Sequence, residues 1–349
     1  MKRILFISGG YKEKNHFVKL VLQDMKDVEL YDTYRWNKQV SYYNDKRNIF
    51  EKISEKLRLP IDFHRANYRI ISLCKKYKFD YIFVIKGNHI YPSTIKQLRR
   101  HQPQAFLINW SLDDMQAKHN RSIFYTINLK HYDLVVSTKS YNCLPNELPK
   151  LGAKKVLFQN NSFYNYPFLR DIERPKQFKY DVCFIGTAEI ERFNSMNFLA
   201  KNGVRIKIFG SNWDEKAFSN YSKNISIDCN NLDQESYYKT IADSKISLCF
   251  LRKINRDLQT LRSVEIPAVG GFMIAERTSE HLQMFKENSE AVFFSNDNEL
   301  LEQVKRFLSN DTAREEIALN GKKRCHSDYR LMDRMIEILN MSDIDINSN

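Results

Sequence analysis

The sequence predicts an α/β protein built from two doubly wound parallel sheets. Short apolar runs of strand length alternate with helix-like segments, which is typical of parallel strands joined by crossover helices. The alternation stops at a polar, proline-containing stretch, residues 169–178, and starts again at residue 181. The 349 residues are also more than twice the roughly 150 of a typical domain. We therefore expect two Rossmann-like domains facing each other across a cleft, and not one large barrel.

Five strands are predicted in the first half, residues 1–170. Each is a short, mostly apolar run bounded by polar or turn residues. They are residues 4–8, 81–85, 105–109, 134–137 and 155–158. The first follows Met1-Lys2-Arg3 and is too short for the apolar core of a signal peptide, so we interpret it as a strand.

The second half repeats the pattern over residues 171–325. Its predicted strands are residues 181–185, 205–209, 226–228, 246–251, 272–275 and 292–294. Its clearest predicted helices are residues 234–243, 279–285 and 299–308. After Asp311 the sequence favours helix to about Leu339, so residues 326–349 are expected to form a C-terminal helix with a frayed tail from Ser342.

Composition excludes several classes of protein. Apolar residues make up 42% and aromatic residues 13%, too many for a disordered chain, and no apolar run approaches the ~20 residues of a membrane helix. The six cysteines stand alone, without zinc-ligand spacing, which favours reduced thiols in the cytoplasm and predicts no metal site. The net charge of +13 indicates an anionic partner, and nucleic acid, anionic lipid and phosphorylated small molecules all fit it.

Polar loops follow three strands predicted in the first half, where ligands of doubly wound folds bind. Gly9 and Gly10 follow the first strand, but they lack the full dinucleotide fingerprint, so a tight turn explains them equally well. Lys86 directly follows an apolar strand, where an ammonium group is not expected for packing. Asp113 and Asp114 follow another and suit a general base or sugar-hydroxyl contacts, with helix capping as the alternative.

Two clusters in the second half suit a diphosphate. A turn at Gly186 opens a helix that carries Arg192, so backbone amides and a guanidinium converge. Further on, Arg262 and Glu265 share one face of a short helix that Asp257 or Thr260 caps. The alternative for the second cluster is a structural Arg–Glu pair, which leaves the following Gly-Gly turn unexplained.

Residues 262–276 resemble the corresponding segment of CgeB-type glycosyltransferases, which have a GT-B fold with a C-terminal domain like that of glycosyl transferases group 1. The resemblance continues at residues 181–187 with Arg192, at residues 210–213, and more loosely at residues 86–87 and 110–114. It covers most of the chain from about residue 80 to residue 325.

The resemblance implies transfer of a sugar from a nucleotide-sugar donor to a glycan, lipid-linked or protein acceptor. Glu265 would then accept hydrogen bonds from the ribose. Arg192 and Arg262, with amides near Gly186 and Thr260, would neutralise the diphosphate in place of a metal, so no cofactor is expected. Trp213 would pack near the base or in the core. The donor-binding residues on this basis are Gly186, Thr187, Arg192, Gly210, Trp213, Asp257, Thr260, Arg262, Glu265, Gly270 and Gly271.

One position departs from related retaining enzymes, which carry a second Glu eight residues before the ribose-binding one. Here that position is Asp257, which leaves the stereochemistry open. The catalytic candidates are Lys86, Asp113 and Asp114, and the acceptor-side loops contain Gly9, Gly10, Gly87, Asn88 and Trp110.

Two other functions remain as alternatives. A GT-B epimerase or hydrolase would act on the donor without an acceptor. A basic protein that binds nucleic acid or an anionic surface would explain the charge, although the sequence has no helix-turn-helix, RNA-binding aromatic motif or zinc ligands. For the transferase we expect a cytoplasmic location, with the basic N-terminal domain at the inner face of an anionic membrane.

Overall fold

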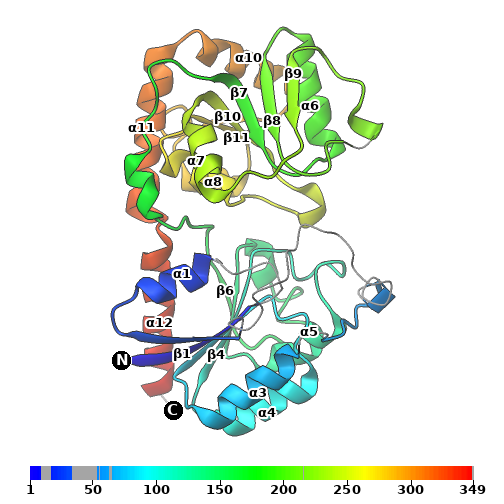
Figure 1. Cartoon of the computed structure of the whole chain (residues 1–349), viewed down its shortest axis with the longest axis vertical. Coiled ribbons are helices and arrows are strands. Elements are labelled where there is room, and N and C mark those ends of the chain that lie inside the picture. The colour runs from blue at the N-terminus through cyan, green and yellow to red at the C-terminus, as the bar shows by residue number, and fades with distance from the viewer. Residues whose placement is uncertain (9–16, 34–52, 55, 63–64, 215, 348–349) are drawn as a thin grey trace. The chain divides into compact units, whose positions relative to one another are not determined.

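The computed structural model describes residues 1–8, 17–33, 53–54, 56–62, 65–214 and 216–347. The chain divides into two compact units, shown in Figure 1. Unit 1 contains residues 1–160 and 335–349, and unit 2 contains residues 161–334. The boundary thus falls at residue 160 and not at the expected 170, and the end of the chain belongs with the first unit.

Unit 1 is built on one six-stranded parallel sheet with the strand order β2-β1-β3-β4-β5-β6. Its strands are β1 (Lys2–Ile7), β2 (Val28–Asp32), β3 (Tyr81–Ile85), β4 (Phe106–Ser111), β5 (Leu134–Ser137) and β6 (Val156–Phe158). Its helices include α1 (Phe17–Asp24), α3 (Ala66–Lys76), α4 (Pro92–His101) and α5 (Ile123–Asn128). The five predicted strands are confirmed. The sequence does not predict the sixth, β2, because Val-Glu-Leu-Tyr-Asp is a half-buried edge strand without a continuous apolar run.

Unit 2 is built on a second six-stranded parallel sheet with the order β12-β11-β10-β7-β8-β9. Its strands are β7 (Tyr180–Ile185), β8 (Ile206–Phe209), β9 (Ile225–Asp228), β10 (Ser244–Cys249), β11 (Met273–Glu276) and β12 (Val292–Phe294). Its helices include α6 (Ile190–Lys201), α7 (Gln234–Ala242), α8 (Arg262–Ala268), α9 (Ser279–Met284), α10 (Asp297–Leu308) and α11 (Asp311–Asp328). All six predicted strands are confirmed, with shifts of one or two residues at their ends.

The last helix, α12, spans Leu331–Asn347 and runs from unit 2 into residues grouped with unit 1. It continues through residues where we expected a frayed tail from Ser342. Met335, Ile338 and Leu339 of this helix are buried, which explains why the helix persists beyond unit 2.

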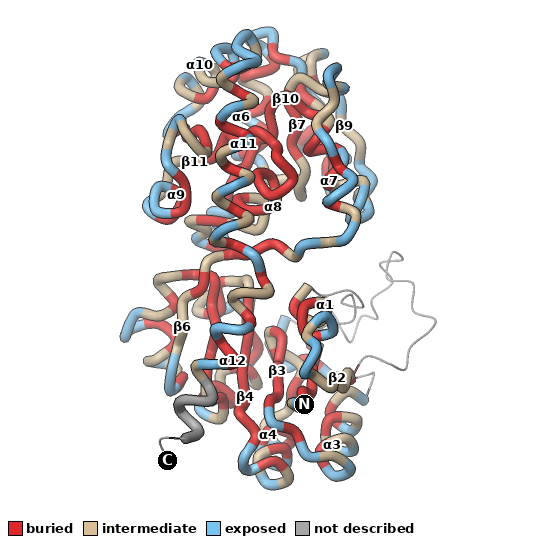
Figure 2. The backbone as a smooth tube through the Cα atoms, turned by 90° about the vertical axis from the view of Figure 1, so that its left-hand side faces the viewer, coloured by how far each residue is buried: buried red, intermediate tan, exposed pale blue. Residues whose placement is uncertain are grey.

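The central strands of each sheet are buried on both faces, as Figure 2 shows by colour. All five residues of β3 and all six of β4 are buried in unit 1, and β10 is buried almost throughout in unit 2. Helices cover parallel sheets on both sides, so the polar loops collect at the strand ends. The loops after β3 and β4 therefore meet at one edge of the first sheet, and those after β7, β10 and β11 meet at one edge of the second.

The turns after β7 and β8 are fixed by an unusually close backbone approach. A side-chain carbon on Gly210 would lie 2.2 Å from the carbonyl oxygen of Gly186, and Gly210 itself has a φ of 138°. The Gly186 amide donates to the Phe209 carbonyl oxygen at 2.9 Å. Only glycine therefore fits at residue 210, and its absence of a side chain sets the position of Gly186.

We predict that Gly210→Ala lowers the free energy of unfolding by about 2–4 kcal/mol, because the new methyl group overlaps the Gly186 backbone. Gly203→Ala is the matched control, since Gly203 also has a positive φ, 90°, but a methyl group there would meet no atom within 4 Å. Urea unfolding of both variants separates the overlap from backbone strain. Equal losses in the two variants would contradict the role assigned to the Gly186 contact.

Candidate functional site

The Gly186 turn is also held by Trp213. The indole Nε1 donates to the Gly186 carbonyl oxygen at 2.8 Å, and the ring packs edge-on against Phe184 and Phe218. Trp213 is 3% exposed and belongs to the main hydrophobic cluster of unit 2. Of the two alternatives for Trp213, the structure places it in the core, where it positions the turn. Thr187, the next residue along the turn, is exposed and lies beside Ser211.

Two guanidinium groups share the ring of Phe184 at the carboxyl end of β7. The Arg192 and Arg262 Cζ atoms lie 5.7 Å and 5.5 Å from the ring centroid. Arg262 donates to the backbone carbonyls of Ile185, at 3.4 Å, and Phe250, at 3.0 Å. Arg192, from the first turn of α6, donates to the Thr187 carbonyl oxygen at 3.3 Å. The two clusters recognised separately in the sequence are thus brought together by the sheet.

The surroundings of this pair leave several of its hydrogen-bond donors without partners. Arg192 is 3% exposed, and burial, reinforced by Arg262, lowers its pKa to about 10. Glu189 lies 3.5 Å from Arg192 without hydrogen-bond geometry and is shared with Arg252, at 2.7 Å. Within the described ranges, Arg192 Nε and Nη2 and Arg262 Nε have no hydrogen-bond partner. A bound anion would supply the missing partners and relieve the repulsion.

Glu265 lies one turn along α8 from Arg262 and is held by α7. Its Oε2 accepts a hydrogen bond from the Tyr237 hydroxyl at 2.8 Å. Burial raises the pKa of Glu265, while the Tyr237 hydrogen bond and the Arg262 charge oppose that rise. The carboxylate is half-buried and therefore has a fixed position with one oxygen already bound. The sequence does not single out Tyr237, because its spacing from Glu265 carries no recognisable signal.

A buried polar chain fixes the start of α8. The Thr260 amide donates to Ser263 Oγ at 3.0 Å, and Ser263 Oγ lies 2.7 Å from His281 Nε2. His281 Nδ1 lies 2.6 Å from the Glu276 carbonyl oxygen, so Nδ1 carries the proton and Nε2 accepts from Ser263. Burial lowers the pKa of His281 to about 4, so the ring is neutral. Thr260 therefore belongs to a structural network that orients Arg262 and Glu265.

Glu276 was not among the residues predicted to form the site. It ends β11, and its Oε1 accepts a hydrogen bond from the Leu251 amide at 2.7 Å. Burial raises the pKa of its carboxyl, and the charges of Lys253 and Arg192 oppose that rise. The signal available in the sequence is its position at the carboxyl end of a buried strand.

Three of the predicted donor-side residues have clear local roles. Asp257 holds the turn before α8, because its carboxylate accepts from the Arg252 amide, at 3.3 Å, and from Asn255, at 2.9 Å. The Gly270 and Gly271 amides donate to the carbonyls of residues 267 and 266 and end α8. These glycines precede β11, so they lie at the amino edge of the sheet, opposite the arginines, and we assign them no part in donor binding.

In unit 1, Lys86 and Asp113 form an ion pair between the loops after β3 and β4. Lys86 Nζ lies 2.7 Å from Asp113 Oδ2, and both side chains are about one-third exposed, 32% and 33%. Lys86 adopts a φ of 56°, an uncommon conformation for a residue with a side chain, and the following Gly87 has a φ of 80°. Such strain is stored most often at functional sites. Asn88 uses its amide group to hold Ser122 and Asn120.

Asp114 and Trp110 are buried in unit 1. The Asp114 carboxylate is 0% exposed and accepts from the Gln116 amide, at 3.1 Å, and from Asn142 Nδ2, at 2.9 Å. Asp114 therefore holds a turn and does not cap the following helix, since α5 begins at Ile123 with Ser122 as its cap. Its burial removes it from the groups that can reach a substrate. Trp110 lies on β4, a central strand of the sheet, and is 2% exposed. Gly9 and Gly10 lie outside the described residues.

Two other kinds of site are absent from the described ranges. They contain no group of three or more His, Cys, Asp and Glu side chains arranged to hold a metal ion. No helix in the same residues is both long enough and apolar enough to cross a bilayer.

The neutral, buried His281 predicts an acid-sensitive fold. Because its folded-state pKa, about 4, lies below the ordinary 6.5, its contribution is complete above about pH 6.5 and is lost as the pH falls towards 4. The loss amounts to about 3 kcal/mol at 1.36 kcal/mol per pKa unit. Urea unfolding from pH 7 to pH 4.5 should show a smaller loss in His281→Gln than in the wild type. Parallel pH profiles would contradict the assignment.

Comparisons with known proteins agree with this architecture. Residues 193–340 match the family model described as glycosyl transferase-like. Comparison with curated protein sequences gives no match. Sucrose-phosphate synthase from Thermosynechococcus elongatus has a similar structure, with 10% identity, full coverage of both chains and a TM-score of 0.60.

Two further solved structures extend over nearly the whole chain. HepE from Anabaena, in complex with UDP and glucose, is 9% identical, covers 98% of this chain and 100% of its own, and has a TM-score of 0.61. An alpha-glucosyltransferase in complex with UDP and a 13-mer DNA is 12% identical, covers 98% and 99%, and has a TM-score of 0.64. These likenesses show the two-sheet GT-B fold. The family match adds a glycosyl transferase-like domain at residues 193–340.

Proposed function

We propose that unit 2 holds a nucleotide-sugar donor at the carboxyl edge of its sheet. The observation that carries this proposal is the guanidinium pair over Phe184, whose buried N–H groups lack partners within the described residues and whose like charges repel each other. A diphosphate offers oxygens for both arginines at once. The half-buried Glu265, fixed by Tyr237 of α7, is the group we assign to the ribose hydroxyls.

The solved neighbours suggest which nucleotide to test first. HepE was solved in complex with UDP-glucose as well as with UDP and glucose, and the alpha-glucosyltransferase was solved with UDP. A uridine diphosphate sugar is therefore our first choice of donor. We also propose that the chain belongs to the CgeB-type subfamily, which its sequence resembles.

We also propose that the reaction needs no metal ion. During sugar transfer the leaving diphosphate gains negative charge, and groups already in place stabilise it most effectively. Arg192 and Arg262 supply two positive charges next to Gly186 without any ligand rearrangement. This fixed arrangement of two positive charges supports the proposal.

On the acceptor side we assign the Lys86–Asp113 pair to contacts with a glycan, lipid-linked or protein acceptor. Both groups are partly exposed, on loops at the carboxyl edge of the sheet of unit 1. If the reaction inverts the anomeric configuration, Asp113 is the carboxylate available as general base, because Asp114 is buried. If it retains configuration, no such base is needed.

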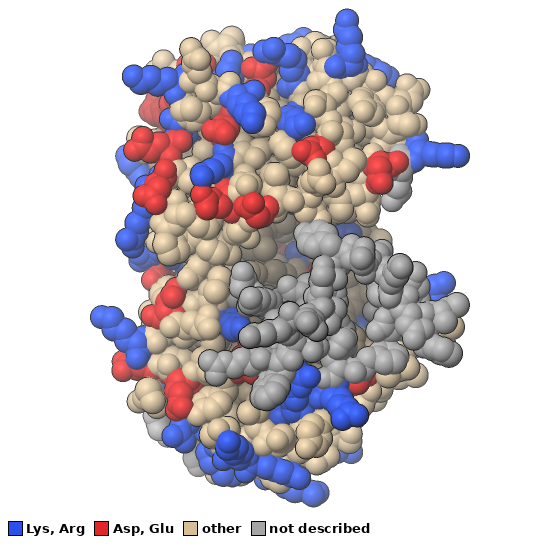
Figure 3. All heavy atoms as spheres, viewed as in Figure 1, with Lys and Arg blue, Asp and Glu red and all other residues tan. Residues whose placement is uncertain are grey.

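We further propose that the protein lies peripherally at the inner face of an anionic membrane. The last turns of α3 and α4 both carry basic residues, namely Lys75, Lys76, Arg99, Arg100 and His101. Figure 3 shows Lys and Arg side chains gathered at the end of unit 1 where these helices lie in Figure 1. Positive residues also suit the carboxyl ends of helices, which is the structural alternative.

The donor proposal predicts selective stabilisation by a nucleotide. At 100 times its dissociation constant, a ligand stabilises the folded state by about 2.7 kcal/mol, which a thermal-shift assay detects. We expect UDP or another nucleoside diphosphate to raise the melting temperature of the wild type. Arg262→Gln and Glu265→Gln should weaken binding by about tenfold or more, because each removes a charge-assisted hydrogen bond.

Two exposed positions of the same unit are the matched controls. Arg205→Gln and Glu235→Gln make the same chemical changes at surface ion pairs, and both should keep the wild-type response. A wild type that responds to no nucleotide would overturn the donor proposal. Product analysis with the donor alone tests the epimerase or hydrolase alternative, which the structural likeness to a putative UDP-N-acetylglucosamine 2-epimerase from Listeria monocytogenes keeps relevant.

The metal proposal makes a separate prediction. Sugar transfer measured in excess EDTA should proceed at the same rate as with added Mg²⁺ or Mn²⁺, within about twofold, because fixed arginines stabilise the leaving group. A rate that falls about tenfold or more in EDTA and returns with one divalent ion would reject metal independence while leaving the donor site in place.

A further inference from the structure

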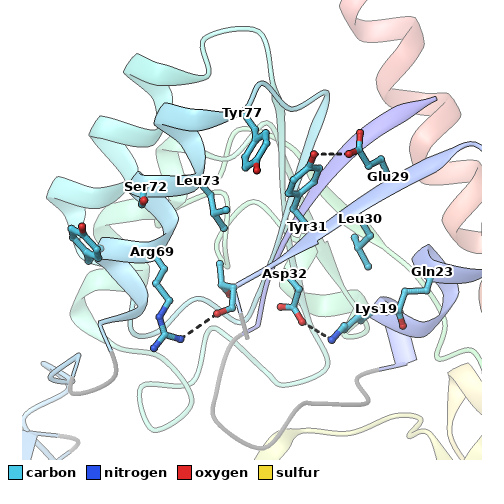
Figure 4. Close-up of a pocket in the computed structure, with 12 residues that line it drawn as sticks. Lys19, Gln23, Glu29, Leu30, Tyr31, Asp32, Arg69, Ser72, Leu73 and Tyr77 are labelled. Atoms are coloured by element: carbon cyan, nitrogen blue, oxygen red, sulfur yellow. Dashed lines mark hydrogen bonds and ion pairs between the residues drawn. The ribbon is translucent and has the colours of Figure 1, made fainter. Parts of the chain in front are cut away.

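Two cavities among the described residues of unit 1 differ in electrostatic character. The larger, about 650 Å³, lies between α1, β2 and α3, and Figure 4 shows its lining side chains. Its charges are largely matched: Lys19 pairs with Asp32, and Glu29 accepts from the Tyr31 hydroxyl. Two cationic and two anionic side chains line it, so it has no marked preference for ligand charge.

The smaller cavity, about 290 Å³, is strongly basic, and we call it the basic pocket. Its lining includes Arg58, Lys86, His89, His119 and Arg121, and no Asp or Glu is among its described lining residues. The loop after β3 and the segment that precedes α5 form much of its wall. Asn88 and Ser122 join these two segments, since the Asn88 side chain accepts from the Ser122 amide at 3.0 Å.

Arg121 is the least exposed cation of this pocket, at 8%. Its Nη1 donates to the carbonyl oxygens of Met115, at 3.0 Å, and Gln116, while its Nε has no hydrogen-bond partner in the described part of the chain. Arg58 Nε donates to the Arg121 carbonyl oxygen at 3.0 Å, which brings a second guanidinium beside the first. Burial lowers the pKa of Arg121, and the charge of Arg58 lowers it further.

The positive charges of the basic pocket are offset only in part. Asp114 and Glu147 act to raise the pKa of Arg121, but burial and the charge of Arg58 outweigh them. Lys86 has Asp113 as its partner, but neither Arg58 nor Arg121 forms an ion pair within 4 Å among the residues that the structure describes. Holding two guanidiniums together with no carboxylate in direct contact is unfavourable, and a dianion in the cavity would reverse the sign of that interaction. The fork of N–H donors on arginine matches the oxygens of a phosphate group.

We propose that the basic pocket binds a phosphate group carried by the acceptor, so that the acceptor is a phosphate ester of a sugar, a polyol or a lipid. This inference rests on the proposed function, because it assigns the anion to the acceptor and the donor to unit 2. The cavity suits one phosphate and the start of its alcohol. Nucleic acid fits less well, because the described lining contains no Phe, Tyr or Trp on which a base could stack.

The direct test is calorimetric titration of the full-length protein with glycerol 3-phosphate, with glycerol as the uncharged probe. We expect glycerol 3-phosphate to bind and glycerol not to bind. Arg58→Gln and Arg121→Gln should each weaken binding about tenfold or more. Arg58→Gln is the safer variant, because Arg121 also holds the backbone of residues 115–116. Arg205→Gln, at an exposed arginine of unit 2, is the matched control and should bind as the wild type does.

The thermal shift caused by UDP separates this inference from the proposed function. Arg58→Gln and Arg121→Gln should keep that shift, because both residues belong to unit 1. A wild type that responds to UDP but binds no glycerol 3-phosphate would overturn the inference and leave the donor site intact. Equal weakening in Arg58→Gln and Arg205→Gln would also overturn it, since that result indicates attraction to the net charge alone.

Vesicle flotation distinguishes a lipid phosphate from a soluble one. Flotation with phosphatidylglycerol vesicles, but not with phosphatidylcholine vesicles, that is lost in Arg58→Gln supports a lipid headgroup in the pocket. Binding of glycerol 3-phosphate without flotation supports a soluble phosphorylated acceptor. Flotation that depends on Lys75 and Lys76, combined with no binding of glycerol 3-phosphate, places the anion contact on α3 and overturns the inference.

Discussion

The contact of two guanidinium groups with one buried aromatic ring is the interaction on which the proposed donor site depends. Two like charges in a poorly solvated position cost free energy, and the ring of Phe184, backbone carbonyls and the shared Glu189 offset only part of that cost. The protein therefore keeps two guanidinium groups whose N–H donors are not all paired within the described residues. In a transferase this arrangement is useful, because negative charge increases on the departing diphosphate as the sugar leaves.

The surrounding structure holds this arrangement in place. Gly210 approaches the Gly186 backbone so closely that the turn after β7 has a single position, and the Trp213 indole supports it from the core. On the other side, Ser263 and His281 tie the start of α8 to β11. These contacts are buried and fully formed before any ligand arrives. Such preorganisation reduces what must be reordered during the reaction.

The positive side chains of unit 1 are arranged differently. Lys86 adopts a left-handed backbone conformation that directs it into an ion pair with Asp113, and the basic pocket lies beside it. In unit 2 two guanidinium groups lie over the ring of Phe184, whereas in unit 1 basic side chains line a cavity between loops. The basic residues behind the +13 net charge of the chain therefore differ in their roles. A few arginines carry specific chemistry, and many other basic residues lie at helix ends.

The sequence alone determined the two α/β units, eleven of the twelve strands in the described residues, and the identity of Arg192, Arg262 and Glu265 as a group worth testing. These features depend on short-range patterns, because buried parallel strands are continuous apolar runs and the loops after them hold ligands. Only the tertiary structure showed that Gly270 and Gly271 lie at the opposite edge of the sheet, that Asp114 is buried, and that Tyr237, Glu276 and Arg121 join the sites. Burial, strand order and contacts between distant segments decide those points, and no local pattern of residues encodes them.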